Sequence, residues 1–176
     1  MRRSGSNGLA RLGAIVLLAA VSASLAQASA PRRIISAEGV RVVVPAGWQR
    51  VPAASPGPVT DPRTVLVVGT TGVRPRPSWC QIAAYSLPAT GAVVVVVRWK
   101  SVSSAGGAPL RPGRAELEKL RSVHRPSFEC FSGRGAVAEV LLGGHPYQVN
   151  VMVGDRAGKE RVAAALAVAR SFALTR

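Results

Sequence analysis

The run of five valines at residues 93–97, in "GAVVVVVRWK", constrains the fold of this chain more than any other feature. Valine is β-branched, which favours extended backbone over helix. A strand with one solvated face alternates apolar and polar residues, whereas this run is apolar at every position. It therefore predicts a strand that is buried on both of its faces.

Several other segments also have the composition of strands. Residues 40–44 and a return strand beginning at Trp48 are separated by a Pro-Ala-Gly turn, and Trp48 is expected to anchor the core. Residues 64–70 are apolar and rich in β-branched side chains, and residues 136–142 and 147–153 flank a Gly-Gly pair that suits a tight hairpin. Residues 80–86 are ambiguous between a short helix and a strand.

Two segments have helical spacing. Near the C-terminus, Val162, Leu166 and Ala169 recur on one side of a helix, and Ala165 and Phe172 extend the same stripe. A shorter helix is expected within "RPGRAELEKLRSV", with its leucines on one side and a Glu116 to Lys119 pair in the exposed turn. Together these segments predict an α+β fold: a mainly antiparallel sheet of five to seven strands with the C-terminal helix packed on one face.

The N-terminus has the layout of a secretory signal peptide. Arg2, Arg3 and Arg11 precede an apolar run at residues 12–21, and Ala26-Gln27-Ala28 then matches an A-x-A cleavage site. We expect residues 1–28 to be a signal peptide cleaved after Ala28, which leaves one secreted or extracytoplasmic domain at residues 29–176. The alternative is an uncleaved anchor, but the apolar run is shorter than the roughly 20 residues of a spanning helix.

The charge of the chain favours anionic partners. Removing the three arginines of the signal peptide leaves 20 basic residues against 8 acidic ones, a formal net charge of +12. Such a charge favours an anionic cell-wall polymer, a lipid headgroup or an envelope protein as the partner. Nucleic acid is not expected, because aromatic residues make up only 5% of the chain and no nucleic-acid-binding module is visible. The alternative is a compositional bias toward arginine that serves only solubility.

The two cysteines, Cys80 and Cys130, are expected to form one disulfide. An exported chain meets an oxidising environment, where an even number of cysteines indicates pairing. The alternatives are a nucleophilic cysteine with His124 or His145 as its base, or free or metal-binding thiols. No catalytic signature surrounds either cysteine, so the structural bond is the preferred interpretation.

No established catalytic motif is present. The sequence has no G-x-S-x-G, H-E-x-x-H, Walker loop or Rossmann fingerprint, and both histidines lie next to turn residues. We therefore expect no catalytic residue, no metal site and no cofactor. The alternative is a small secreted hydrolase with His124 or His145 as its base.

Four arginines are the candidate anion-binding residues. Arg74 and Arg76 flank Pro75 beside Trp79, and the second pair flanks His124; the candidates are Arg74, Arg76, Arg121 and Arg125. A guanidinium can grip a phosphate or carboxylate through two hydrogen bonds and can stack on an aromatic ring. The alternative is a solvated loop in which Trp79 packs over the disulfide.

The order of these motifs resembles that of small secreted two-cysteine proteins of high-GC Gram-positive bacteria. The matching features are Pro45-Ala-Gly-Trp48, "DPRTVLVVGT", "GAVVVVVRW" and "GGHPYQVNVMVGDRAGKERVAAALAVARSF". His145-Pro146 replaces a Gly-Arg pair that often occupies that turn. The order also resembles the PsbP/Mog1-type α+β sandwich, whose members are mostly binding or assembly factors. The resemblances imply an exported α+β domain. With the positive charge and the absence of catalytic motifs, we expect a non-catalytic module that binds an anionic partner or an envelope protein through an arginine-rich surface; a small secreted hydrolase and a purely structural domain with incidental charge are the alternatives.

Overall fold

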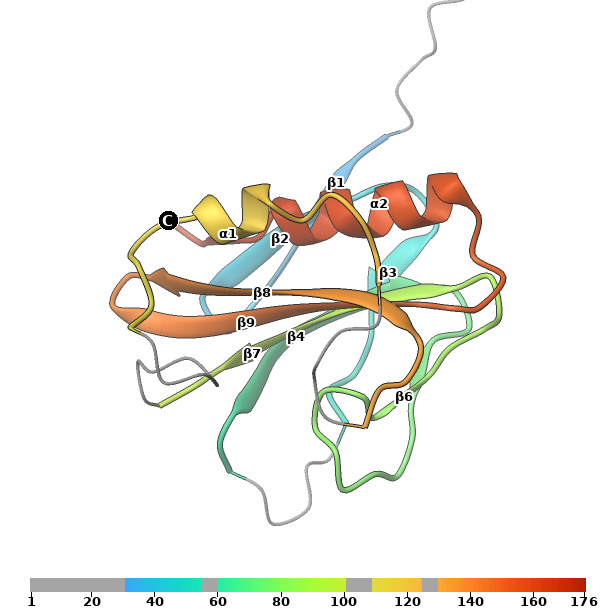
Figure 1. Cartoon of the computed structure of the whole chain (residues 1–176), viewed down its shortest axis with the longest axis horizontal. Helices are drawn as coiled ribbons and strands as arrows, with labels where there is room; N and C mark the ends of the chain where they lie inside the picture. Colours follow the sequence, from blue (N-terminus) through green and yellow to red (C-terminus); the bar gives the residue numbers. More distant parts are fainter. Residues whose placement is uncertain (1–30, 55–59, 101–108, 125–129) are drawn as a thin grey trace, which may run out of the picture.

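The computed structural model describes residues 31–54, 60–100, 109–124 and 130–176 (Figure 1). The predicted signal peptide, residues 1–28, lies outside these ranges. The strands are β1 (Arg33–Ala37), β2 (Val40–Val44), β3 (Trp48–Arg50), β4 (Arg63–Thr70), β5 (Arg74–Pro75), β6 (Tyr85–Ser86), β7 (Ala92–Arg98), β8 (Arg134–Leu142), β9 (His145–Val153) and β10 (Ala173–Leu174). The helices are α1 (Ala115–Glu118) and α2 (Lys159–Arg170).

The five valines lie in β7, at the centre of a five-stranded antiparallel sheet of order β3-β4-β7-β9-β8. All five are fully buried, which confirms the prediction of burial on both faces. Val94 and Val96 point to one face, which we call the helix face, and pack in the cluster that includes residues of α2 and β2. The other three, Val93, Val95 and Val97, point to the opposite face, which we call the loop face.

Regular elements cover the helix face. Figure 1 shows α2 lying along the sheet, where it contacts β7, β9 and β2. The predicted apolar stripe is on its buried side, and Phe172 just beyond the helix meets Tyr147 edge to face with ring centroids 5.3 Å apart. The C-terminal helix and its packing on one face are therefore confirmed.

An irregular segment covers the loop face. Residues 80–85 are buried without interruption, and residues 82–85 belong to the same cluster as Val93, Val95 and Val97. Only Tyr85–Ser86 forms a strand, which pairs with β5 in a separate two-stranded sheet. Because every position of the segment is buried, its sequence has neither a helical nor a strand period, which explains the ambiguity of the sequence pattern.

The expectation of a single sheet of five to seven strands was only partly right. The mainly antiparallel α+β architecture is present, but the strands are divided among three sheets, the third of which has the order β1-β2-β10. The segments β2 and β3, which flank the Pro-Ala-Gly turn, do not pair with each other. Instead β2 pairs with β1, which the sequence pattern did not reveal, through a turn in which Glu38 and Gly39 have φ of 50° and 76°.

The other predicted elements are confirmed. The hairpin of β8 and β9 turns at Gly143 and Gly144, which have φ of 57° and 77°. Trp48 is buried in the core, and the short helix α1 buries Leu117. The Glu116 to Lys119 ion pair also forms, at 2.6 Å on the exposed side of that helix.

Candidate anion-binding site

A basic pocket of about 340 Å³ lies at the end of the central sheet where β4 begins and β7 ends. Its lining comes from the start of β4, the end of β7 and the start of β9, and consists of Thr60, Asp61, Arg63, Arg98, Trp99, Lys100 and His145. Three of these side chains are permanent cations and one is a carboxylate. We call this site the β4–β7 pocket.

The antiparallel register of β4 and β7 places two arginines side by side. Arg63 is the first residue of β4 and Arg98 the last of β7, and they are direct cross-strand partners. Side chains at such positions have Cβ atoms about 5 Å apart, and like charges there repel. An anion between the two guanidinium groups would remove this repulsion.

The two arginines differ in their present partners. Arg63 forms an ion pair with Glu38 at 2.9 Å, with both side chains about half exposed. Exposed pairs of this kind stabilise a protein by less than about 1 kcal/mol, so Arg63 can exchange its partner readily. The side chain of Arg98 makes no hydrogen bond or ion pair within the described part of the chain. Its guanidinium is therefore available to a ligand.

Trp99 and its contacts fix the wall of the pocket. Its backbone N–H donates to the carbonyl of Pro146 at 3.0 Å, and its indole N–H donates to Gln148 at 3.2 Å. The buried Gln148 side chain in turn donates to Asn150 at 2.9 Å. This buried chain of hydrogen bonds holds the backbone between Arg98 and Lys100 in place.

On the other side of the pocket, Asp61 holds the backbone of Lys100 in place. Its Oδ1 accepts the backbone N–H of Lys100 at 3.0 Å, so the only carboxylate of the lining is already engaged with the backbone. His145, the first residue of β9, is exposed at the rim. The pocket as a whole offers guanidinium, ammonium and imidazole groups to one small space, which suits an oxyanion.

The arginines predicted from the sequence lie elsewhere. Arg74 and Arg76 are exposed, and Arg76 donates its guanidinium to the carbonyl of Ala83 at 3.1 Å. Arg121 is exposed after α1, and Arg125 lies outside the described residues. None of the three described arginines lines the β4–β7 pocket. Trp79 is 81% exposed, so the alternative in which it packs over the disulfide is wrong.

The two histidines occupy different environments. His145 lines the pocket, whereas His124 exchanges two backbone hydrogen bonds with Gly135, at 2.8 and 2.7 Å, and extends the edge of the sheet. Within the described ranges, no three or more His, Cys, Asp or Glu side chains gather as metal ligands would.

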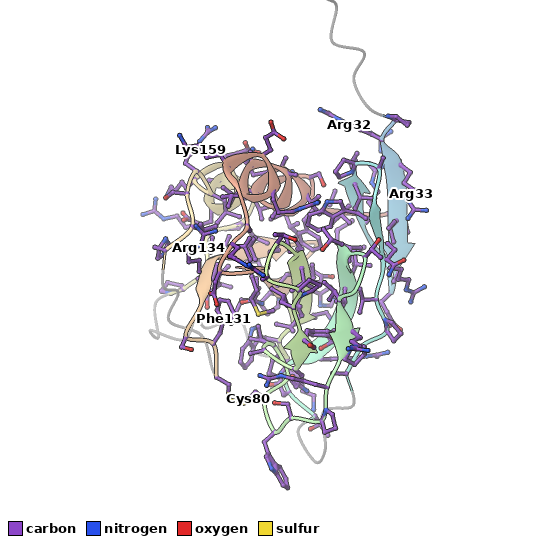
Figure 2. All side chains as sticks on the ribbon, turned by 90° about the vertical axis from the view of Figure 1, so that its right-hand side faces the viewer. Arg32, Arg33, Cys80, Phe131, Arg134 and Lys159 are labelled. Atoms are coloured by element: carbon purple, nitrogen blue, oxygen red, sulfur yellow. A yellow bond between two sulfur atoms is a disulfide. The ribbon has the colours of Figure 1, made fainter. Side chains whose placement is uncertain are left out.

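The predicted disulfide is present. Cys80 and Cys130 are bonded, with Cα atoms 6.2 Å apart and a separation of 50 residues along the sequence. The bond ties the segment that covers the loop face to the start of the chain leading into β8 (Figure 2).

Several arginines serve the fold through backbone carbonyls. Arg114 donates to the carbonyls of Arg170 and Phe172 at the end of α2, and Arg170 donates to that of Leu120 at 2.5 Å. Arg134 donates to the carbonyl of Ala157 at 2.8 Å. Part of the positive charge therefore has a structural use, which separates these arginines from the free Arg98.

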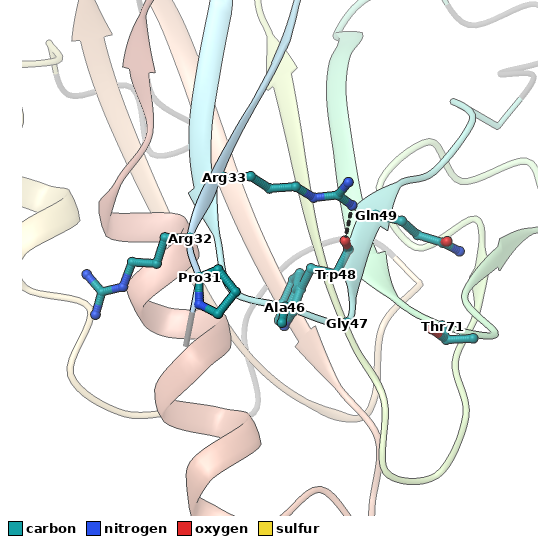
Figure 3. A pocket seen from close by; sticks show the side chains of 8 residues that line it. All are labelled: Pro31, Arg32, Arg33, Ala46, Gly47, Trp48, Gln49 and Thr71. Carbon is teal, nitrogen blue, oxygen red and sulfur yellow. Dashed lines mark hydrogen bonds between the residues drawn. The ribbon is translucent and has the colours of Figure 1, made fainter. Parts of the chain in front are cut away.

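A second pocket of about 420 Å³ lies beside the Pro-Ala-Gly-Trp turn (Figure 3). Arg33 reaches across it and donates to the backbone carbonyl of Trp48, so this guanidinium is engaged. The Nε1 of Trp48 is buried and has no hydrogen-bond partner in the described ranges. With one arginine occupied and the indole N–H out of reach, this pocket offers an anion fewer free groups than the β4–β7 pocket.

The sequence did not reveal the pocket, although a signal was available. "DPR" begins one predicted strand and "RWK" ends the five-valine strand. If these strands are paired in antiparallel fashion, the start of one meets the end of the other and the cations converge. The pairing itself was the missing information.

No protein-family model matches this chain, and no curated protein sequence matches it. None of the helices in the described ranges has the length and apolar character needed to cross a membrane.

Proposed function

We propose that the protein is an exported, non-catalytic binding module that holds an anionic partner in the β4–β7 pocket. The observation that carries this proposal is the cross-strand pair of Arg63 and Arg98, with Lys100 and His145 on the same rim. Two opposed guanidinium groups repel until an anion lies between them. The disulfide and the predicted signal peptide support export.

A phosphate-bearing polymer fits the pocket best. A volume of about 340 Å³ is at the lower end of ligand pockets, enough for one or two phosphate groups. The tetrahedral oxygens of a phosphate can accept bidentate hydrogen bonds from Arg98 while a neighbouring phosphate meets Lys100. The rest of a chain would run outward past the exposed His145.

Calorimetric titration with polyphosphate tests the proposal. The Arg98→Ala, Lys100→Ala double variant should bind roughly tenfold more weakly or worse, because two charge-assisted contacts are lost. The matched control is Arg50→Ala, Arg156→Ala, which removes the same charge from exposed residues outside the pocket lining. Equal weakening by the two double variants would show that only net charge attracts the polymer, and the pocket would then have no specific role.

Polyphosphate also distinguishes a binding protein from a hydrolase. His145 lines the pocket, so a hydrolase would show turnover that His145→Ala removes. We expect no phosphate release from polyphosphate with either the wild type or His145→Ala, and only slightly weaker binding by the variant in calorimetry. Turnover that depends on His145 would replace the binding proposal with the enzyme. Export is tested by the mass of the protein recovered from the host's medium, which should correspond to an oxidised chain starting at Ser29.

A further inference from the structure

The loop of residues 74–80 carries a tryptophan that the fold does not bury. Trp79 is 81% exposed, and the other exposed large apolar side chain of the described ranges, Ile34, is 57% exposed. Tryptophan has a large apolar ring with a polar N–H, a combination found where a protein meets a surface that is apolar on one side and wet on the other. We call residues 74–80 the Trp79 loop.

The Trp79 loop is braced. The Ser78 hydroxyl accepts the backbone N–H of Cys80 at 3.1 Å, and Cys80 is fixed by its disulfide. Arg76 is held to the facing segment, since its backbone N–H donates to Ala84 at 2.9 Å. Two prolines, at 75 and 77, restrict the backbone between these points. The ring of Trp79 is therefore held outward by the structure around it, and contact with a partner would order little additional backbone.

Two arginines precede the ring within the loop. Arg74 and Arg76 are both exposed; one guanidinium nitrogen of Arg76 donates to the carbonyl of Ala83 at 3.1 Å, which leaves its other N–H groups for a ligand. Residues 62–115 contain no Asp or Glu, so no acid near in sequence neutralises them. Figure 2 shows Cys80 at the end of the molecule opposite Arg32 and Lys159. The loop thus presents one aromatic ring and two guanidinium groups at one end of the molecule.

We propose that the Trp79 loop docks on an anionic lipid surface, with the indole of Trp79 at headgroup level and Arg74 and Arg76 on lipid phosphates. A bilayer accepts a single protruding ring without a complementary pocket, and it attracts every cation on the facing side of a chain whose net charge is +12 without the signal peptide. A protein partner would have to supply the cavity that this convex loop lacks. This inference uses none of the residues of the β4–β7 pocket and stands apart from the function proposed above.

Vesicle sedimentation with the oxidised exported chain, starting at Ser29, tests the docking. With mixed phosphatidylglycerol and phosphatidylcholine vesicles, Trp79→Ala should weaken partitioning by roughly tenfold, because an aromatic side chain loses its buried area. Arg74→Ala and Arg76→Ala should each weaken it about fivefold, and added salt should reduce the effect of both. Brominated lipids should quench tryptophan fluorescence in the wild type and less in Trp79→Ala.

Matched variants distinguish docking from general attraction. Ile34→Ala removes an exposed apolar side chain elsewhere, and the Arg50, Arg156 double alanine variant removes two exposed charges outside the loop. Both should bind vesicles better than the loop variants. Equal binding by Trp79→Ala and wild type, or undiminished binding to vesicles of phosphatidylcholine alone, would overturn the inference.

Two further results would also count against lipid docking. If Arg98→Ala, Lys100→Ala abolished vesicle binding while Trp79→Ala did not, lipid phosphates would be bound by the β4–β7 pocket. If Trp79→Ala lost binding to a purified envelope protein of the host but kept vesicle binding, the loop would recognise protein. Thermal unfolding of each variant shows whether it has kept the fold.

Discussion

The two faces of the five-stranded sheet are equally buried but are covered in different ways. On the helix face, α2 packs on β7 and the β1–β2 hairpin contacts β4, all within the cluster that contains Val94 and Val96. On the loop face, residues 82–85 of the irregular segment pack in the cluster of the three other valines of the run. A regular cover satisfies its own backbone hydrogen bonds, whereas an irregular one needs side chains and cross-links to hold it. The loop face should therefore be the face that opens first.

Polar groups are buried mainly beneath the irregular cover. Gln148 and Asn150 of β9 are bonded to each other, and Asn150 also donates to the carbonyl of Val95 at 3.3 Å. They lie on the same side of β9 as Met152, which belongs to the loop-face cluster. This network positions Trp99 in the wall of the basic pocket, so the loop face supports the proposed site.

The largest expected loss of stability comes from the helix face. Phe172→Ala removes a fully buried ring that packs on Tyr147. The free energy of unfolding should fall by about 3–5 kcal/mol, since a large cavity forms among regular elements that cannot collapse into it. Chemical denaturation measures the change. A loss below that of the disulfide variant described next would contradict the stronger role assigned to the helix face.

Removal of the disulfide should act on the loop face alone. Cys80→Ser, Cys130→Ser opens a loop of 50 residues, for which chain entropy gives about 4 kcal/mol before native strain is subtracted. We expect a loss of roughly 2–4 kcal/mol. Hydrogen exchange should speed up in residues 80–87 and remain slow in α2. Uniform acceleration across both faces would show that the two covers are not independent.

A smaller effect is expected from the buried polar network. Asn150→Ala leaves the Gln148 amide without its acceptor in a buried site, which should reduce the free energy of unfolding by about 1–3 kcal/mol. The same variant should change the fluorescence of Trp99, because the network fixes that ring. Unchanged fluorescence would mean that Trp99 is held by packing alone.

The smallest effect is a pH dependence on the loop face. Burial raises the pKa of Tyr85 above its ordinary value of 10.0, although the hydrogen bond from the Ala54 N–H opposes the shift. Since the folded-state pKa is the higher one, the stabilisation is complete below pH 10 and is lost as the pH rises through the folded-state pKa. Tyr85→Phe should flatten the decline of stability above pH 10, as measured by thermal melts across that range. An equally steep decline in the variant would assign it to other groups.

The sequence predicted the helix face and its supports far better than the loop face. The five valines are recognised by their β-branched composition, the stripe of α2 by its helical period and the hairpin by its Gly-Gly turn, all without knowledge of the fold. Residues 80–85 have no period because every position is buried, and β1 contains the exposed Ile34 beside polar residues. Tertiary contacts, rather than the local sequence pattern, determine the conformation of such segments.

The candidate site was missed for a related reason. Arg74 and Arg76 stand out in the sequence because they lie close together along the chain, beside an aromatic residue. Arg63 and Arg98 are 35 residues apart in the sequence and meet only through the pairing of β4 with β7. Charge convergence across a sheet depends on register, which composition does not specify.

The central claim is that an anion is held between Arg63 and Arg98, and amide chemical shifts measured during a pyrophosphate titration test it most directly. We predict that the largest shifts occur at Arg63, at residues 98–100 and at His145, with small shifts at Arg74 and Arg76. Arg98→Ala should abolish the large shifts. Shifts centred on Arg74 and Arg76, or spread evenly over all exposed arginines, would contradict the assignment of the site.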